Sequence, residues 1–229
     1  YLHRVEKTAI IFFIHLNYMI MKKLYLFLVL IPLFTYSFGQ TYPADNDHEF
    51  DDGSKIVLPE EITDDLKNNL SLLCKVWGFV KYYHPESAKG NFDMDYELFR
   101  IMPTVLEATN KEEFNNAIAG WLEKIGDPGE AGPGIPSDWE IKREPDFSWM
   151  NSNNFPETIL DELDKIKEAK RSNTHYYLSV GAASNLVFEH EKPYENLKYP
   201  DDGFRLLTLF RYWNMVEYNF PYKYLTDVP

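Results

Sequence analysis

Apolar residues recur at helical spacing over much of this chain, most clearly between Thr63 and Pro85. Their period places one continuous apolar stripe on a single face of an amphipathic helix. The stripe consists of Leu66, Leu70, Leu73, Trp77 and Val80, at spacings of four, three, four and three residues. Thr63 is suited to cap the start of this helix, and Pro85 is expected to end it.

Two further segments follow the same logic. A second helix is predicted over residues 95–102, and Pro103 is expected to stop it because proline lacks the N–H that a helix needs. Asn110 with Glu113 resembles a capping box and predicts the start of a third helix, which Gly126 ends. The apolar face of this third helix is Phe114, Ile118, Trp121, Leu122 and Ile125.

Residues 127–156 interrupt the pattern with repeated Gly and Pro residues, which indicates a loop. Trp139, Phe147 and Trp149 predict that this loop is ordered, because these side chains are poorly suited to contact with water. A fourth helix is predicted over residues 157–170.

Two short strands are then expected over residues 175–180 and 185–188, joined through Gly181. The predicted fold class is therefore α+β and predominantly α-helical, with amphipathic helix-bundle units and a few short strands.

An internal repeat links two distant segments, residues 77–85 and 213–221. They share Trp, Val, Tyr and Pro at identical spacing, offset by 136 residues. The shared residues are Trp77, Val80, Tyr82 and Pro85 in the first copy and Trp213, Val216, Tyr218 and Pro221 in the second. Such a repeat predicts a duplicated helical unit that cannot bury its apolar stripe alone. We therefore expect both tryptophans to occupy matching buried sites, with each helix ending at or just before its proline.

The same segments carry a family resemblance. Residues 73–85 (LCKVWGFVKYYHP), 88–91 (AKGN), 95–99 (DYELF), 191–201 (EKPYENLKYPD) and 205–214 (RLLTLFRYWN) resemble the N-terminal region of exported bacterial C-terminal-processing, or tail-specific, serine peptidases. The resemblance covers roughly residues 63–226.

In that family, the resemblance implies a helical N-terminal region followed by a peptide-binding PDZ module and a catalytic core. The core uses a serine nucleophile and typically a lysine base. No serine or lysine of this chain lies in a motif of that core, so we expect no catalytic residue, no cofactor and no metal site here. We interpret the chain as an inactive fragment whose partners are the downstream PDZ and peptidase domains of the same protein, which in turn act on peptide substrates.

The first 39 residues predict export. Residues 21–39 have the layout of a secretory signal peptide: a basic start, a short apolar core and small residues before Gln40. Residues 1–20 are interpreted as an upstream, non-native extension, because the chain opens on Tyr1 and carries a second apolar run. The alternative is a membrane anchor made of two short segments. The expected location is the periplasm, the outer surface or the medium.

Composition and residue spacing argue against nucleic-acid binding, an EF-hand calcium site and a cysteine nucleophile. The formal net charge is −13 over 229 residues, and no basic cluster offers a surface for nucleic acid. The acidic residues 40–62 do not match the spacing of an EF-hand, so a solvated linker is predicted there. Cys74, the single cysteine, is interpreted as a small buried hydrophobe and not as a nucleophile.

The predicted organisation after the linker is a first helical unit (63–126), a region of loop, helix and short strands (127–200), and the start of a second helical unit (201–229). The predicted function is a non-catalytic scaffold for a serine peptidase. The alternative is an independent exported module that binds a glycan or peptide with exposed aromatic rings. The orientation of Trp77 and Trp213 distinguishes the two, because buried rings favour the scaffold and an exposed coplanar pair favours the binding module.

Overall fold

Helix α2 (Asp64–Tyr83) begins and ends where its sequence predicts. The hydroxyl oxygen of Thr63 accepts a hydrogen bond from the amide of Leu66 at 3.2 Å, which satisfies one of the unpaired amides of the first turn. The helix ends before His84, and Pro85 becomes the first residue of the short helix α3 (Pro85–Ala88). All five residues of the predicted stripe are buried.

The computed structural model describes residues 17–23, 41–134, 145–182 and 185–220. The chain divides into two units, Tyr1–Thr41 and Tyr42–Pro229. In the first unit, residues 17–23 are helical and exposed. Among the residues described, no helix combines the length and the apolar character needed to cross a bilayer. The rest of the predicted signal peptide lies outside the described residues.

Helix α4 (Met94–Glu107) corrects the second predicted helix, because it continues through Pro103. The side chain of Asp93 caps its start by accepting from the amides of Asp95 and Tyr96. The ring of Pro103 is exposed, whereas Met102 and Val105 on either side of it are buried. Burial of the apolar face beyond residue 103 outweighs the loss of one backbone hydrogen bond.

Helix α5 (Lys111–Ile125) confirms the third predicted helix. The side chain of Asn110 accepts from the amide of Glu113 at 3.0 Å. The carboxylate of Glu113 reaches back to the amide and hydroxyl of Thr109, one residue earlier than a capping box requires. Gly126 ends the helix with a φ of 104°, a conformation that glycine adopts without strain.

The predicted loop over residues 127–156 contains a short helix that the sequence reading missed, α6 (Ser148–Ser152). Trp149 is buried and Phe147 is partly buried, as expected of an ordered segment, whereas Trp139 lies outside the described residues. Helix α7 (Glu157–Glu168) follows and buries the residues Ile159, Leu163 and Ile166.

The two predicted strands form an antiparallel hairpin of β1 (Leu178–Val180) and β2 (Leu186–Phe188), each shorter than expected. In its register Leu178 pairs with Phe188 and Val180 pairs with Leu186. The described fold is thus predominantly helical with one two-stranded sheet, which confirms the predicted class.

The prediction of a solvated linker before α2 was wrong for residues 42–58, which pack against the rest of the unit. The segment includes the single-turn helix η1 (Pro43–Asn46), and it buries Ala44, Phe50 and Ile56 in the core. Its polar groups are paired as well, since Ser54 donates from its amide and hydroxyl to the carboxylate of Asp201. The apolar residues spaced between the acidic ones supply these buried positions, and they decide the structure of the segment.

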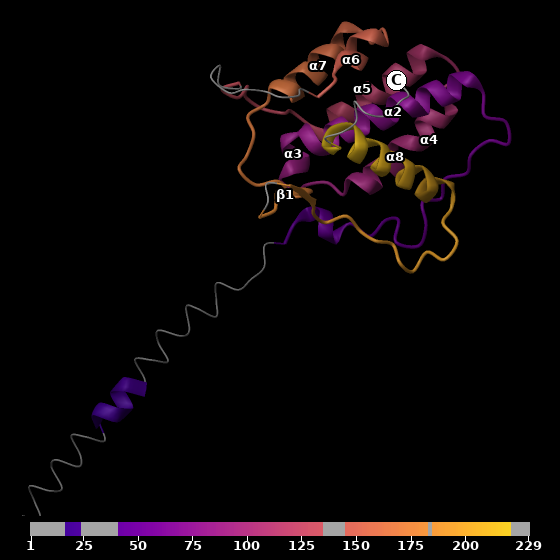
Figure 1. Cartoon of the computed structure of the whole chain (residues 1–229). Helices are drawn as coiled ribbons and strands as arrows, with labels where there is room; N and C mark the ends of the chain where they lie inside the picture. Colours follow the sequence, from indigo (N-terminus) through magenta and orange to yellow (C-terminus); the bar gives the residue numbers. More distant parts are fainter. Residues whose placement is uncertain (1–16, 24–40, 135–144, 183–184, 221–229) are drawn as a thin grey trace, which may run out of the picture. The chain divides into compact units, whose positions relative to one another are not determined.

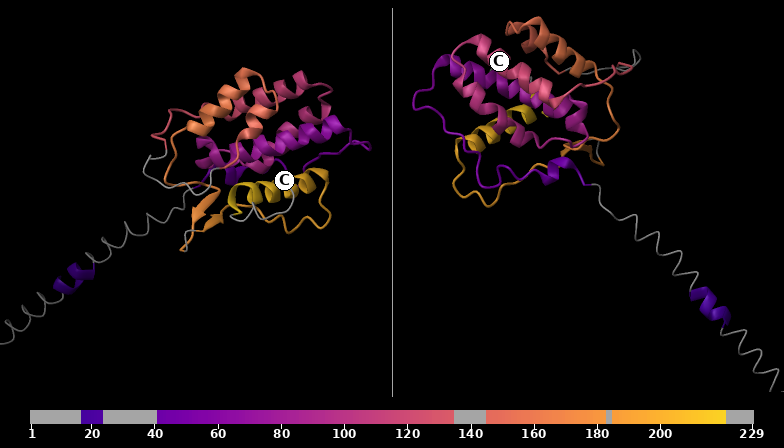
Figure 2. Two further views of the ribbon diagram at one scale, coloured as in Figure 1. Left: turned by 45° about the horizontal axis from the view of Figure 1, so that its top comes forward. Right: turned by 180° about the vertical axis from the view of Figure 1, so that it is seen from behind.

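Helix α8 (Asp202–Asn219) lies along one side of α2, while α5, α6 and α7 lie on the other (Figures 1 and 2). Helix α2 contacts α4, α7 and α8 and is the centre of this unit. The regions predicted separately as 63–126, 127–200 and 201–229 therefore fold together with the preceding acidic segment as one unit, because each supplies part of the same core.

Candidate functional site

The two copies of the sequence repeat pack against each other, as α2 and α8 (Figure 1). Both helices end two residues before the proline of their copy, at Tyr83 and at Asn219. Their last turns are closed by equivalent bonds, since the amide of His84 donates to the carbonyl of Val80 and the amide of Phe220 donates to that of Val216. The predicted equivalence of the helix ends is confirmed.

The two helices are in close contact at Gly78 and Asn214, which stand at equivalent positions of the repeat. A Cβ atom on Gly78 would lie 1.8 Å from Oδ1 of Asn214, so only glycine fits at this crossing. The amide nitrogen of Asn214 donates to the carbonyls of Cys74 at 3.0 Å and Phe210 at 2.9 Å. Asn214 therefore links the two helices by a buried side chain.

The two tryptophans of the repeat do not occupy matching sites. Trp77 is 0% exposed, its indole N–H donates to the carbonyl of Met94, and its ring centroid lies 6.2 Å from that of Phe210. Trp213 is only partly buried, with the ammonium group of Lys75 5.9 Å from its ring centroid. The prediction of matching buried sites was wrong for Trp213, because α8 packs on α2 through Asn214 and leaves the preceding residue at the edge of the contact.

The tyrosines of the repeat come together. Tyr82 and Tyr218 lie with ring centroids 6.5 Å apart, in an edge-to-face arrangement. Val80 is fully buried and Val216 partly buried. Of the two prolines, Pro85 opens α3, whereas Pro221 lies outside the described residues.

A network of four charged side chains lies beside this crossing. Lys81 of α2 and Arg211 of α8 each contact both Asp95 of α4 and Glu191. The ammonium nitrogen of Lys81 lies 2.7 Å from the carboxylate of Glu191, and Lys81 is 0% exposed. The hydroxyl of Tyr194 also donates to Asp95, at 2.8 Å. Lys81 is sealed from solvent and joins α2 to α4 and to Glu191 inside the fold, so the network connects these segments.

The electrostatics of the network follow from burial and charge. Burial alone would raise the pKa of Asp95, but Lys81 and Arg211 outweigh it and hold that pKa well below its usual range. For the neighbouring Asp93, burial and the charge of Asp95 raise the pKa, and the ammonium of Lys192 at 2.8 Å only partly offsets them. Burial raises the pKa of the Cys74 thiol to about 12, in line with its interpretation as a buried hydrophobe.

The C-terminal end of α2 is held by three side chains from two other segments, the short helix α3 and the connection between α7 and β1. Its last four carbonyls all find donors: the first pairs with the backbone amide of the C-cap residue, and the other three pair with side chains. The pairs are Val80 with the amide of His84, Lys81 with the hydroxyl of Ser87, Tyr82 with the ring of His175, and Tyr83 with the guanidinium of Arg171.

Each of the two histidines at this end accepts a backbone N–H on its Nδ1 atom. His84 accepts from Glu86 and His175 accepts from Tyr177, at 3.1 and 3.0 Å. Their Nε2 atoms face backbone carbonyls and so carry the proton. Burial lowers the pKa of both imidazoles, to about 4 for His175.

Sequence reasoning did not find the Gly78–Asn214 contact or the charged network. Gly78 was a signal for the contact, because a glycine in the interior of an otherwise strong helix usually has a packing reason. The charged residues carried no such signal, because Lys81, Asp95, Glu191 and Arg211 are far apart in the sequence. Within the described ranges, no group of three His, Cys, Asp or Glu side chains is arranged to hold a metal ion.

No protein-family profile matches the chain, and no curated protein or solved structure is significantly similar to it.

Proposed function

We propose that this chain is the non-catalytic, N-terminal scaffold region of an exported tail-specific serine peptidase. The observation that carries the proposal is the complete burial of Trp77 in the interface of α2 with α4 and α8. A scaffold requires the shared aromatic positions to serve the core, whereas a stacking surface requires them to be exposed.

The outer face of α8 supports this role. Leu209, Tyr212 and Met215 are 58%, 66% and 40% exposed and follow one another at spacings of three residues. Beside them lies a groove of about 480 Å³, whose apolar wall includes Tyr194 and Leu197. A contiguous apolar surface of this kind is typical of a site that another domain covers. We propose that the PDZ and peptidase domains of the same protein dock on this face.

The proposed parent activity is serine-type proteolysis of peptide substrates, to which this chain contributes no catalytic group. The proposed location is the periplasm or the outside of the cell, reached through the signal peptide of residues 21–39. The charged network and the Asn214 crossing suit a scaffold, because buried paired charges and a buried carboxamide define the mutual position of helices.

The proposal is tested by sequencing the genomic locus downstream of codon 229 and expressing the full reading frame. We expect a continuous frame that encodes a PDZ module and a Ser/Lys core. A serine-directed covalent probe should then label one serine beyond residue 229 and leave residues 1–229 unlabelled. A frame that encodes no such core, or stoichiometric labelling of a serine within residues 1–229, would refute the proposal.

The alternative, an independent binding module with exposed aromatics, requires Trp77 and Trp213 to form an exposed coplanar pair. The burial of Trp77 and the different environments of the two rings argue against that form of the alternative.

A further inference from the structure

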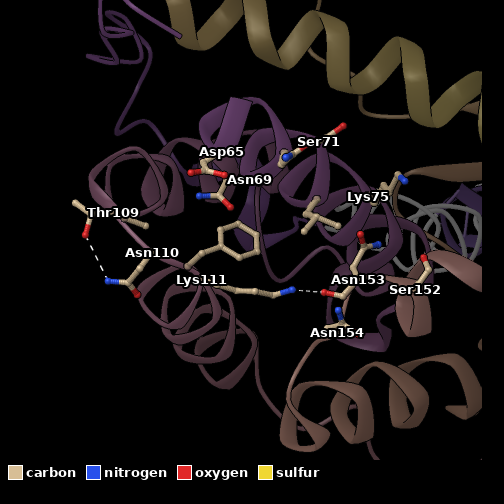
Figure 3. Close-up of a pocket in the computed structure, with 14 residues that line it drawn as sticks. Asp65, Asn69, Ser71, Lys75, Thr109, Asn110, Lys111, Ser152, Asn153 and Asn154 are labelled. Atoms are coloured by element: carbon tan, nitrogen blue, oxygen red, sulfur yellow. Dashed lines mark hydrogen bonds between the residues drawn. The ribbon is translucent and has the colours of Figure 1, made fainter. Parts of the chain in front are cut away.

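Figure 3 shows a polar groove of about 550 Å³. It lies along the first half of α2, whereas Lys81 of the charged network lies near the other end of that helix. Its walls are the first half of α2, the turn between α4 and α5, and the turn between α6 and α7. The volume is within the range of about 300–1,000 Å³ found for small-ligand sites. Five carboxamides line the groove: Asn68, Asn69, Asn110, Asn153 and Asn154.

Two of these carboxamides already form hydrogen bonds within the protein, at the walls of the groove. Asn110 accepts from the amide of Glu113 at the start of α5, and the amide nitrogen of Asn153 donates to the carbonyl of Trp149. Figure 3 shows Lys111 reaching across from one turn to the other, where it donates to the backbone carbonyl of Asn153 at 2.5 Å. The two turns are thus tied together before any ligand binds.

The other three carboxamides remain available. The side chains of Asn68, Asn69 and Asn154 make no hydrogen bond to any residue that the structure describes. Asn68 and Asn69 stand on α2 and Asn154 stands on the opposite wall. A ligand in the groove therefore meets unpaired donors and acceptors from both sides.

The chemistry of these groups selects the ligand. A carboxamide presents one carbonyl and one NH₂ group, which match the N–H and C=O of a peptide bond. Glycan sites usually offer the face of an aromatic ring, but the one aromatic residue that lines this groove, Phe114, is 1% exposed. The charges of Lys75 and Lys111 are partly balanced by Asp65, so the groove does not favour a highly charged ligand.

We propose that this groove binds an extended, uncharged peptide segment through its main chain. This role goes beyond that of a scaffold and does not depend on it, since the groove lies wholly within residues 65–154 and uses none of the α8 surface.

The test is fluorescence anisotropy of the full chain with a labelled, acetylated and amidated hexapeptide of alternating Ser and Val. We expect saturable binding that Asn69→Ala and Asn68→Ala each weaken by about fivefold to tenfold, the effect of one lost hydrogen bond. Asn116→Ala, on an exposed position of α5 outside the groove, is the matched control and should leave the Kd unchanged. Both groove variants stay folded, because each replaces an exposed or half-exposed helical residue by a better helix former.

A competition experiment distinguishes recognition of the peptide main chain from binding through the peptide side chains. The unlabelled peptide should displace the probe, and its backbone N-methylated version should not. Absence of saturable binding at millimolar peptide, equal competition by the N-methylated peptide, or binding of a chitin oligosaccharide in place of the peptide would each overturn the proposal. None of these results bears on the docking face of α8, so the scaffold proposal stands or fails separately.

Discussion

The carboxamide of Asn214 lies directly against the α-carbon of Gly78, and the two residues occupy the same position in the two copies of the repeat. The first copy leaves space at Gly78, and the side chain of Asn214 in the second copy fills that space. The repeat is therefore symmetric in sequence at its Trp, Val, Tyr and Pro positions and asymmetric at the crossing itself. This asymmetry lets two similar helices approach closely around one buried hydrogen-bonding side chain.

Gly78→Ala should destabilise the protein by about 1–3 kcal/mol, because the new methyl group overlaps Asn214 and forces the helices apart. In an Asn214→Ala background the same change should cost nothing or stabilise, since the clash is gone and alanine favours the helix by up to about 1 kcal/mol. Urea denaturation of the four proteins of this double-mutant cycle measures the coupling. Additive effects would show that the two helices do not meet at this point.

Trp77→Ala should cost about 3–5 kcal/mol of unfolding free energy, as large-to-small changes in a core do. Trp213→Ala should cost clearly less, because its ring is only partly buried and leaves a smaller cavity. Chemical denaturation of both variants gives the comparison. Equal losses would mean that α8 buries its tryptophan as fully as α2.

Arg211→Met should destabilise the protein by on the order of 3 kcal/mol, because it removes one of the two cations that the network places against the buried carboxylates of Asp95 and Glu191. Arg205→Met on the same helix is the matched control. Among the residues that the structure describes, the side chain of Arg205 pairs with Asp202 alone, on the exposed side of α8, so its loss should cost at most about 1 kcal/mol. Similar melting temperatures for the two variants would contradict the structural importance of the network.

Stability should fall as the pH is lowered from about 6.5 to about 4, the interval between the ordinary pKa of histidine and that of His175 in the fold. In this interval the unfolded chain takes up a proton that the folded protein rejects, so acid favours unfolding. Burial is the main cause, and the cations Arg171 and Lys81 add to it. The expected loss from this one group is on the order of 2 kcal/mol after allowance for its partial exposure.

His175→Gln should flatten this part of the stability profile, measured as unfolding free energy against pH. The difference between the variant and the unmodified protein gives the contribution of the His175 imidazole to the pH dependence of stability. This comparison is needed because Asp93 changes the stability in the opposite direction over part of the same pH range. Its raised pKa makes the folded state gain stability as the pH falls from about 6 to 3.8. An unchanged profile in the variant would show that His175 is not held neutral by the fold.

Exported protein should begin at Gln40, because residues 21–39 have the layout of a cleaved signal peptide. Intact-mass measurement or N-terminal sequencing of protein recovered from outside the cytoplasm determines the start, with allowance for cyclisation of Gln40 to pyroglutamate. Recovery of a chain that still begins at Tyr1 would favour the membrane anchor instead.

The sequence by itself determined the local elements of this protein. The spacing of Leu66, Leu70, Leu73 and Trp77 defines one helix face, and the capping residues Thr63 and Asn110 define where two helices begin. These features act within a few residues, so they can be read without knowledge of the fold. The repeat likewise predicted that α2 and α8 end at equivalent positions.

Only the tertiary structure decided how the elements are used. The packing of Met102 and Val105 carries α4 through Pro103, and the core takes Phe50 and Ile56 from a segment that reads as an acidic linker. The charged network, the crossing at Gly78 and the amide-lined groove each join side chains that are far apart in the chain. Their energies depend on distance and burial in space, and a sequence records only the order of its residues.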